Sequence, residues 1–217
     1  MPILFINEVD SGTTVGVWHC TEEAEQLRSM LVLDPGDEKS YASIRNATRK
    51  IQWLGCRMLL SSFLKTREIR IHYNEFGKPS LINSPAKISL SHSGGCSAAI
   101  LSTTYSAGID LEEVRKRIAR VADRFLSEDE LSIAFGEDRL EKLTLFWCVK
   151  EAVYKIIGKP DLDMQHEICI ESFNYLCASS GKLSARIKLE DKEISIPVAY
   201  HLFDQFVLAW ALTSEVF

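Results

Sequence analysis

The stretch Gly108-Ile109-Asp110-Leu111-Glu112 decides how the rest of the chain is interpreted. Successive side chains of a β-strand point to opposite faces, so Ile109 and Leu111 would enter a core while Asp110 and Glu112 share the other face. The two carboxylates would stand about 7 Å apart along the strand, and Gly108 would leave room for a close backbone approach. Such a pair can bind a hard cation. A half-buried strand with a solvated acidic face would show the same pattern.

A second stretch lies on a helix predicted over residues 138–157. Trp147, Glu151 and Lys155 recur every four residues and therefore share one stripe of that helix. A neighbouring apolar stripe is expected to be buried, and it consists of Phe146, Val149, Val153, Ile156 and Ile157. The helix would present a carboxylate and an amine one turn apart, which is also the arrangement of an ordinary surface Glu–Lys pair.

The two stretches together resemble the paired signature of the 4′-phosphopantetheinyl transferases, in their longer, Sfp-type branch. The matching motifs read Gly108-x-Asp110-x-Glu112 and Trp147-x-x-Lys150-Glu151-Ala152-x-x-Lys155. Two further family-like pieces lie upstream, Phe76-Gly77-Lys78-Pro79 and Ser89-Leu90-Ser91-His92-Ser93. The order and approximate spacing also match, so the resemblance covers the chain roughly from the forties to the 150s.

This resemblance implies a holo-[acyl-carrier-protein] synthase type of activity. The 4′-phosphopantetheine arm of coenzyme A would be transferred to a serine of an apo acyl or peptidyl carrier protein, releasing adenosine 3′,5′-bisphosphate. It implies Mg²⁺ held by Asp110, Glu112 and Glu151, with Glu151 and Lys155 as catalytic residues. Contacts with coenzyme A are implied at Arg49, Lys78, Ser91, His92, Lys150 and Lys155. A non-catalytic relative that only binds coenzyme A or a carrier is the alternative.

A long helix is predicted from about Ser40 to Phe63, because apolar residues recur there at three- and four-residue steps. Another stripe of that helix carries Arg45, Arg49, Trp53 and Arg57. It is either a solvated surface or an anion-binding face, since Arg is well suited to phosphate. The family has a basic stretch before a Leu-Gly step like the one here, which favours Arg49, but Lys50 and Arg57 stay open as alternatives.

Two upstream segments are candidates for phosphate contacts. Residues 87–90 are predicted as a strand that runs into Ser91-His92-Ser93-Gly94-Gly95, where glycine permits close approach of a ligand. A histidine satisfied by local hydroxyls in a hairpin turn explains the same residues. The resemblance implies instead that Ser91 and His92 lie against the phosphates of coenzyme A, and that Lys78, in a turn, contacts a nucleotide phosphate.

Basic residues crowd the segment after the acidic strand, namely Arg115, Lys116, Arg117, Arg120 and Arg124. Acyl carrier proteins, the protein substrates of this family, are typically acidic, so a basic face could steer such a partner. A solvated surface would look the same. Ser127 and Glu130 are spaced as a capping box that starts a short helix, and Gly158 with Pro160 ends the 138–157 helix.

The predicted fold class is α+β, with a boundary between residues 104 and 105. The resemblance implies a pseudo-dimer of two similar subdomains, 1–104 and 105–217, each a small sheet packed against a long helix, the second carrying the metal site. The last third is predicted as four strands, over 168–175, 182–189, 193–201 and 205–212.

Composition excludes several functional classes. The 217 residues carry a net charge of −5, which argues against a general nucleic-acid binder. The six cysteines form no Cys-x-x-Cys pair, so we expect reduced thiols and a cytoplasmic protein. The N-terminus lacks a basic region typical of a secretory signal, and no apolar run is long enough to span a bilayer. Common nucleotide-binding glycine loops are absent from the sequence. We expect a monomer.

Overall fold

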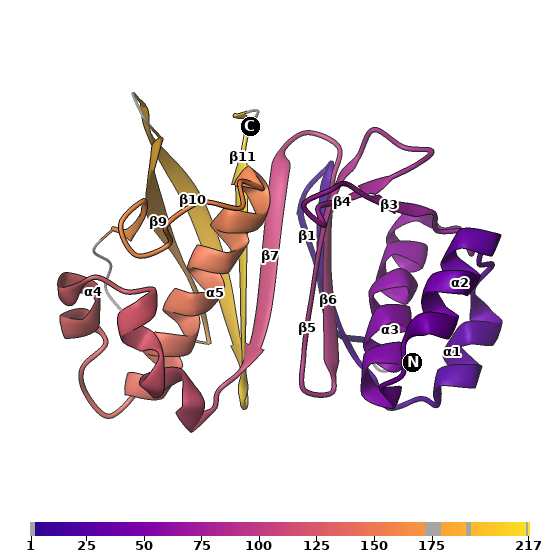
Figure 1. Ribbon diagram of the computed structural model, residues 1–217, viewed down its shortest axis with the longest axis horizontal. Helices are drawn as coiled ribbons and strands as arrows, with labels where there is room; N and C mark the ends of the chain where they lie inside the picture. Colours follow the sequence, from indigo (N-terminus) through magenta and orange to yellow (C-terminus); the bar gives the residue numbers. More distant parts are fainter. Residues whose placement is uncertain (1–2, 172–178, 190–191, 216) are drawn as a thin grey trace. The chain divides into compact units, whose positions relative to one another are not determined.

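The structure, a computed structural model, describes residues 3–171, 179–189, 192–215 and 217. It divides the chain into two compact units, Met1–Tyr105 (unit 1) and Ser106–Phe217 (unit 2). Each unit contains helices and an antiparallel sheet, so the fold is a mixture of α and β structure (Figure 1).

Unit 1 is built on an antiparallel sheet with strand order β1-β2-β6-β5, beside a separate β3-β4 hairpin. Its strands are β1 (Ile3–Asp10), β2 (Thr13–His19), β3 (Ile71–Tyr73), β4 (Pro79–Leu81), β5 (Lys87–Ser93) and β6 (Cys96–Ser102). Its helices are α1 (Ala24–Met30), α2 (Pro35–Ser43) and α3 (Ala47–Leu64). The predicted strand at residues 87–90 is longer than expected, because β5 continues through Ser91 and His92 to Ser93.

The single long helix predicted from residue 40 to residue 63 is wrong: the chain forms α2 and α3 instead. Asp34 caps α2, whose first residue is Pro35, and Pro fits the first turn of a helix. Asn46 then caps α3 by accepting a hydrogen bond from the backbone N–H of Arg49. Two strong N-terminal signals within twelve residues therefore override the continuous apolar periodicity.

The core of unit 1 lies between α3 and the sheet. The helix packs on β6 and β2, and its buried side chains Leu54, Leu59 and Leu60 meet residues such as Trp18 and Ala99 from the strands. Burial of these apolar side chains holds the helix in place. The position of α3 against the end of the β5-β6 hairpin follows from this packing.

Unit 2 contains a second antiparallel sheet, with strand order β7-β11-β10-β9-β8. Its strands are β7 (Ser106–Glu113), β8 (Ile168–Ile170), β9 (Ser180–Leu189), β10 (Lys192–Phe203) and β11 (Phe206–Thr213). Its helices are α4 (Glu128–Ile133) and α5 (Arg139–Ile157), and two 3₁₀ turns precede them, η1 (Lys116–Arg120) and η2 (Ala122–Arg124). The expected strand 168–175 is seen as the short β8, and its residues 172–175 lie outside the described residues.

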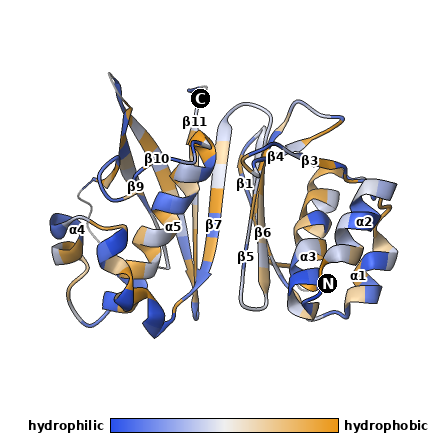
Figure 2. Ribbon diagram, in the orientation of Figure 1, coloured by the Kyte–Doolittle hydropathy of each residue, from blue (hydrophilic) through white to orange (hydrophobic). Residues whose placement is uncertain are grey.

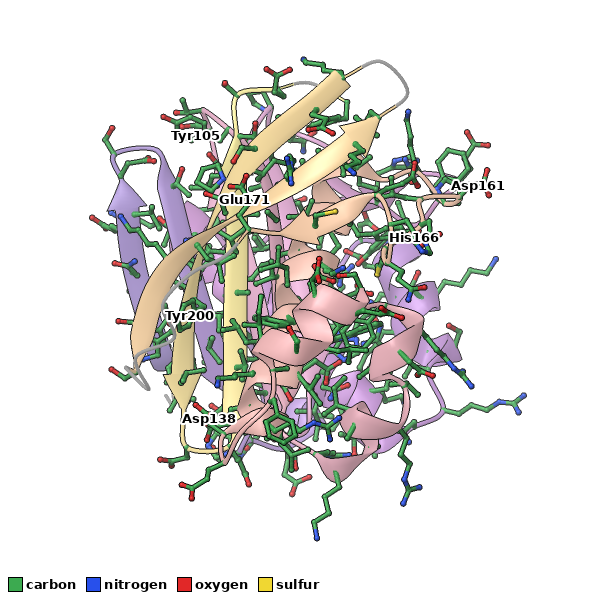
Figure 3. All side chains as sticks on the ribbon, turned by 90° about the vertical axis from the view of Figure 1, so that its left-hand side faces the viewer. Tyr105, Asp138, Asp161, His166, Glu171 and Tyr200 are labelled. Carbon is green, nitrogen blue, oxygen red and sulfur yellow. The ribbon has the colours of Figure 1, made fainter. Side chains whose placement is uncertain are left out.

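Helix α5 is the central element of unit 2. It packs along β7 and β11 (Figure 1), and the five residues of the predicted apolar stripe are all buried in its core. Figure 3 shows the two ends of this helix: Asp138 precedes it near the bottom, and Asp161 and His166 follow it at the upper right. The sequence pattern thus predicted both the helix and its buried face correctly.

The segment after β7 is largely hydrophilic, as the blue ribbon in Figure 2 shows. It forms η1 and η2, and Ile118, Val121 and Phe125 pack its inner side against the core of unit 2. The basic side chains Arg117 and Arg124 are exposed. This confirms a basic surface segment next to the acidic strand.

Two further expectations concern the whole chain. The five described cysteines all carry free thiols: Cys20, Cys56, Cys96, Cys148 and Cys169. Among the described residues, none of the helices has the length and apolar character needed to cross a membrane.

Candidate functional site

Strand β7 places its acidic residues on the face of the sheet that α5 covers. Asp110 stands opposite Ala209 of β11, and Glu112 stands opposite Val207. Cross-strand partners share a face, and both of these partners belong to the core beneath α5. The alternation predicted for this strand is therefore confirmed. The sequence predicted burial only for the face of Ile109 and Leu111, but the face of Asp110 is buried as well. Both faces are buried over residues 109–111.

Gly108 explains how the strand and the helix come so close. A Cβ at this position would lie 1.9 Å from the carbonyl oxygen of Ala152 in α5 and 3.0 Å from Cγ1 of Ile156. No side chain fits there, so glycine is required for the contact. The first residue of the Gly-x-Asp-x-Glu motif thus brings β7 onto the turn of α5 that follows Glu151.

Lys155 of α5 crosses to β7 and pairs with Asp110. Its Nζ lies 2.7 Å from Oδ1 of Asp110 and donates a second hydrogen bond to the carbonyl oxygen of Ile109 at 2.9 Å. Burial on its own would lower the pKa of Lys155, but the charge of Asp110 and its hydrogen bond outweigh burial and raise that pKa. The ammonium group is therefore charged, and it balances part of the acidic cluster.

Glu151 interacts electrostatically with the carboxylates of the same cluster. Burial raises the pKa of its carboxyl group to about 7, and the charges of Asp110 and Glu112 add to this while Lys155 opposes it. Cys148, fully buried one turn earlier, has its pKa raised well above the ordinary value by burial and then by Asp110. These couplings bring Asp110, Glu112, Glu151 and Lys155 into one electrostatic unit, from two elements distant in sequence.

The donor set of this unit suits a hard cation. All its acidic donors are carboxylate oxygens, the ligands that Mg²⁺ prefers, and burial followed by the charge of Asp110 raises the pKa of Glu151 to about 7. As the side chains stand, no group of three His, Cys, Asp or Glu residues within the described part of the chain is placed to hold a metal ion. The carboxylates repel one another, and Lys155 binds Asp110, so both effects keep the carboxylate groups apart.

Lys150 does not belong to this cluster, and its contact with coenzyme A stays a prediction. Its side chain is fully buried, and its Nζ lies 2.7 Å from Oε2 of Glu130 and 2.8 Å from the carbonyl oxygen of Met164. Burial lowers the pKa of Lys150, opposed by the hydrogen bond and charge of Glu130. With these two partners, the ammonium group of Lys150 stabilises the interior of unit 2.

Glu130 is a residue whose role sequence reasoning missed. The capping box with Ser127 is present as predicted, but the same carboxylate also accepts a hydrogen bond from the backbone N–H of Ile170 at 2.8 Å. Together with Lys150, it ties α4, α5 and β8 to one buried point. The spacing of Ser127 and Glu130 indicated the cap, whereas nothing local to Glu130 could indicate partners 20 and 40 residues away.

A pocket of about 290 Å³ opens beside Glu112 within unit 2. Ile118, Val121 and Trp147 provide apolar walls, and Arg115 and Arg117 lie at its polar side. Trp147 is fixed by an edge-to-face contact with Phe125, with ring centroids 4.9 Å apart. The stripe residue Trp147 therefore lines a pocket next to the acidic cluster.

The remaining candidate residues lie in unit 1, and they differ in exposure and in the element that carries them. Arg49 is exposed on the first turn of α3, while Ser91 is buried and His92 half-buried on β5. Lys78 is half-buried in the turn of the β3-β4 hairpin, and burial followed by the charge of Lys87 lowers its pKa. The Sγ of Cys56 in α3 donates to the carbonyl oxygen of Ser91 at 3.5 Å, which ties α3 to β5.

Arg57, one of the open alternatives for phosphate binding, is an interior residue. Its guanidinium is almost fully buried, pairs with Asp37 at 2.7 Å and stacks over the ring of Trp53 at 3.3 Å. Lys50 has its Nζ 4.8 Å from the ring centroid of Tyr41. Of the three basic residues, Arg49 is the one whose side chain is exposed.

Comparison with known proteins matches part of this sequence to a family. The family model described as the 4′-phosphopantetheinyl transferase superfamily matches residues 106–211. A 4′-phosphopantetheinyl transferase AcpT of Escherichia coli O157:H7 is 33% identical over 116 residues, which are 51% of this chain and 59% of that protein. The 4′-phosphopantetheinyl transferase ffp of Bacillus subtilis is 27% identical over 128 residues, 57% of this chain and 54% of its own length.

A further relative gives a similar match. The AcpT of Salmonella typhimurium is 31% identical over 123 residues, covering 54% of this chain and 64% of that protein. The chain thus spans less than two-thirds of the length of the curated relatives it matches. The matched region of the family model lies within unit 2 and contains both motifs of the acidic cluster.

Proposed function

We propose that the protein transfers 4′-phosphopantetheine from coenzyme A to a serine of an apo carrier protein, because residues 106–211 match the model of the 4′-phosphopantetheinyl transferase superfamily. The reaction releases adenosine 3′,5′-bisphosphate and depends on Mg²⁺. One observation carries the proposal: within the matched region, β7 and α5 bring Lys155 onto Asp110 and couple both to Glu151.

Asp110, Glu112 and Glu151 are the residues that would hold Mg²⁺. When bound, the ion supplies charge neutralisation at the diphosphate of coenzyme A. The raised pKa of Glu151, caused by burial and then by Asp110, supports this assignment, since a cation would relieve the excess negative charge. The enzyme's main tasks in phosphoryl transfer are positioning and charge stabilisation, and an all-carboxylate donor set serves both.

The transfer step is a displacement at phosphorus. The hydroxyl oxygen of the carrier serine forms the new P–O bond, and the bond to adenosine 3′,5′-bisphosphate breaks with its electron pair on the leaving phosphate. Glu151, directly or through a water that it orients, is the group we assign to accept the proton of the serine, because its carboxylate lies in the acidic cluster beside Asp110 and Lys155. Lys155, charged and one helical turn away, stabilises the leaving phosphate oxygen.

The nucleotide end of coenzyme A is assigned to residues of unit 1. Arg49, Ser91 and His92 lie on elements that pack together within that unit, linked through Cys56 and Ser91. Arg49 offers an exposed guanidinium, which suits phosphate. Lys78 is a fourth candidate in the same unit, and the burial that lowers its pKa would favour pairing with an anion.

Finer features of the family are also proposed for this chain. The pseudo-dimer is supported by the shared plan of the two units, in which one long helix, α3 or α5, covers an antiparallel sheet. The partner would be an acidic acyl or peptidyl carrier protein, steered by the basic residues of η1 and η2. A monomeric state and a cytoplasmic location stay predictions.

A transfer assay tests the proposal. Purified protein, coenzyme A, Mg²⁺ and an apo carrier should yield a carrier heavier by one phosphopantetheine, measured by mass spectrometry. Asp110→Ala and Glu151→Ala should abolish the gain while circular dichroism stays native. Glu113→Ala is the matched control, since Glu113 is the next acidic residue of β7 and forms an exposed ion pair with Arg115.

Two results would count against the proposal in different ways. No mass gain on several unrelated carriers, with coenzyme A still bound, would favour a non-catalytic binding relative. Full activity of both alanine variants would remove Asp110 and Glu151 from the mechanism.

A further inference from the structure

We propose that Gln52 and Ser97 are positioning residues for the binding of coenzyme A. They hold the turn at Gly94 against α3, and thereby set Ser91 and His92 relative to Arg49. This inference rests on the proposed function, which assigns the nucleotide end of coenzyme A to unit 1. Neither residue belongs to a motif of the family resemblance.

Gln52 connects α3 to the turn of the β5-β6 hairpin. It lies three residues after Arg49, close to the same side of the helix, and its side chain is buried. Its Nε2 donates a hydrogen bond to the carbonyl oxygen of Gly94 at 2.8 Å. Gly94 has φ of +54°, in the left-handed region, so the direction of its carbonyl is a property of this particular turn.

Ser97 holds the same helical residue from the other side. It is fully buried on β6, and its Oγ donates to the backbone carbonyl oxygen of Gln52 at 2.9 Å. In the strand register, Ser97 stands directly opposite His92 of β5. The serine therefore links the strand pair that carries His92 to the helix that carries Arg49.

The packing around these two bonds leaves little room for adjustment. A Cβ at Gly55 would lie 2.6 Å from Oγ of Ser97 and 2.9 Å from Sγ of Cys20. The helix thus lies directly on β6, one turn after Gln52. Buried polar groups are costly to leave without hydrogen bonds, so the amide of Gln52 and the hydroxyl of Ser97 define one arrangement of helix and turn.

Such an arrangement should act on binding more than on turnover. A preorganised set of groups binds a ligand more tightly because less ordering is needed when the ligand arrives. Without the Gln52 bond, the turn at Gly94 can move relative to Arg49, while the acidic cluster of unit 2 is unchanged. The expected signature is a higher KM for coenzyme A with an unchanged kcat, which a general loss of stability would not produce.

The test uses the full-length protein and the variant Gln52→Met, which keeps the length of the side chain and removes the amide donor. Calorimetry measures the Kd for coenzyme A and for adenosine 3′,5′-bisphosphate, and the transfer assay measures KM and kcat. We expect both Kd values to rise about tenfold, the size of one lost positioning hydrogen bond. Ser97→Ala should shift them in the same direction.

Ser61→Ala is the matched control. Ser61 also uses its hydroxyl to bind a backbone carbonyl, that of Thr66, but at the other end of α3. It should leave both Kd values unchanged. The inference is overturned if Gln52→Met has the same Kd values as the control Ser61→Ala. If Gln52→Met does not fold, the same comparison is made with Ser97→Ala. If the wild-type protein binds neither coenzyme A nor adenosine 3′,5′-bisphosphate, the proposed function itself is contradicted.

Discussion

At Gly108, β7 and α5 approach more closely than a side chain would permit. The variant Gly108→Ala would place Cβ 1.9 Å from the backbone oxygen of Ala152, and backbone cannot rotate away as a flexible side chain can. We expect a loss of at least about 1–3 kcal/mol in the free energy of unfolding, as for other overpacked sites, measured by urea denaturation. Gly95→Ala is the control, because its nearest neighbours, ring atoms of His19, are at 3.8 Å. Equal stabilities of the two variants would contradict the close contact.

Glu151 makes the stability of the metal-free protein depend on pH. Burial and then Asp110 raise the pKa of its carboxyl group from 4.5 to about 7. Between these values the folded protein keeps a proton that the unfolded chain releases, so the free energy of unfolding falls as pH rises through this window, by at most about 3 kcal/mol. Urea denaturation with a chelator at pH 5 and pH 8 measures the fall. Glu151→Gln should show less of it, whereas Glu113→Gln should match the wild type, because the hydrogen bond from Arg115 lowers the pKa of Glu113 and keeps this carboxylate ionised throughout the window.

The elements α4, α5 and β8 meet at the buried pair of Glu130 and Lys150. Lys150→Met would leave the carboxylate of Glu130 buried without its ammonium partner, which typically costs about 3–5 kcal/mol. Adding Glu130→Gln should recover part of this loss, because the amide oxygen can still accept a hydrogen bond from the backbone N–H of Ile170. A double-mutant cycle of unfolding free energies measures the coupling. Additive losses would show that the two side chains do not act as a pair.

Periodicity predicted the 138–157 helix well but merged α2 and α3 into one helix, and it could not reveal partners distant in the sequence. The helix 138–157 and its buried stripe followed from local pattern, and the structure agrees almost to the residue. The family resemblance implied a ligand contact for Lys150, and Arg57 stayed an open alternative for phosphate binding on the basic stripe of its helix. Their burial depends on Asp37 and Glu130, each 20 residues away in the chain. No helical pattern records such a pairing.

For the molecule as a whole, the two units differ in how much the family match says about them. The matched region lies within unit 2, where the acidic cluster is assembled entirely from β7 and α5. Unit 1 has a core of its own, built among the described residues from its own helices and strands. Its proposed part in binding coenzyme A therefore rests on the geometry of α3 and the β5-β6 hairpin. Experiments that test unit 1 separately from unit 2 are needed for this reason.

Separate cores predict separate stabilities. Leu59 is fully buried in the core of unit 1, and Phe146 is fully buried in the core of unit 2. Substitution of either by alanine should cost about 2–5 kcal/mol, because a large apolar side chain is lost and a cavity remains. In native-state hydrogen exchange, Leu59→Ala should lower the protection of amides in α3 and β6 while those of α5 and β11 keep theirs. Phe146→Ala should do the reverse. If either substitution lowers protection equally in both units, the two cores unfold as one, and binding defects caused by substitutions in unit 1 would have to be corrected for a loss of order in unit 2.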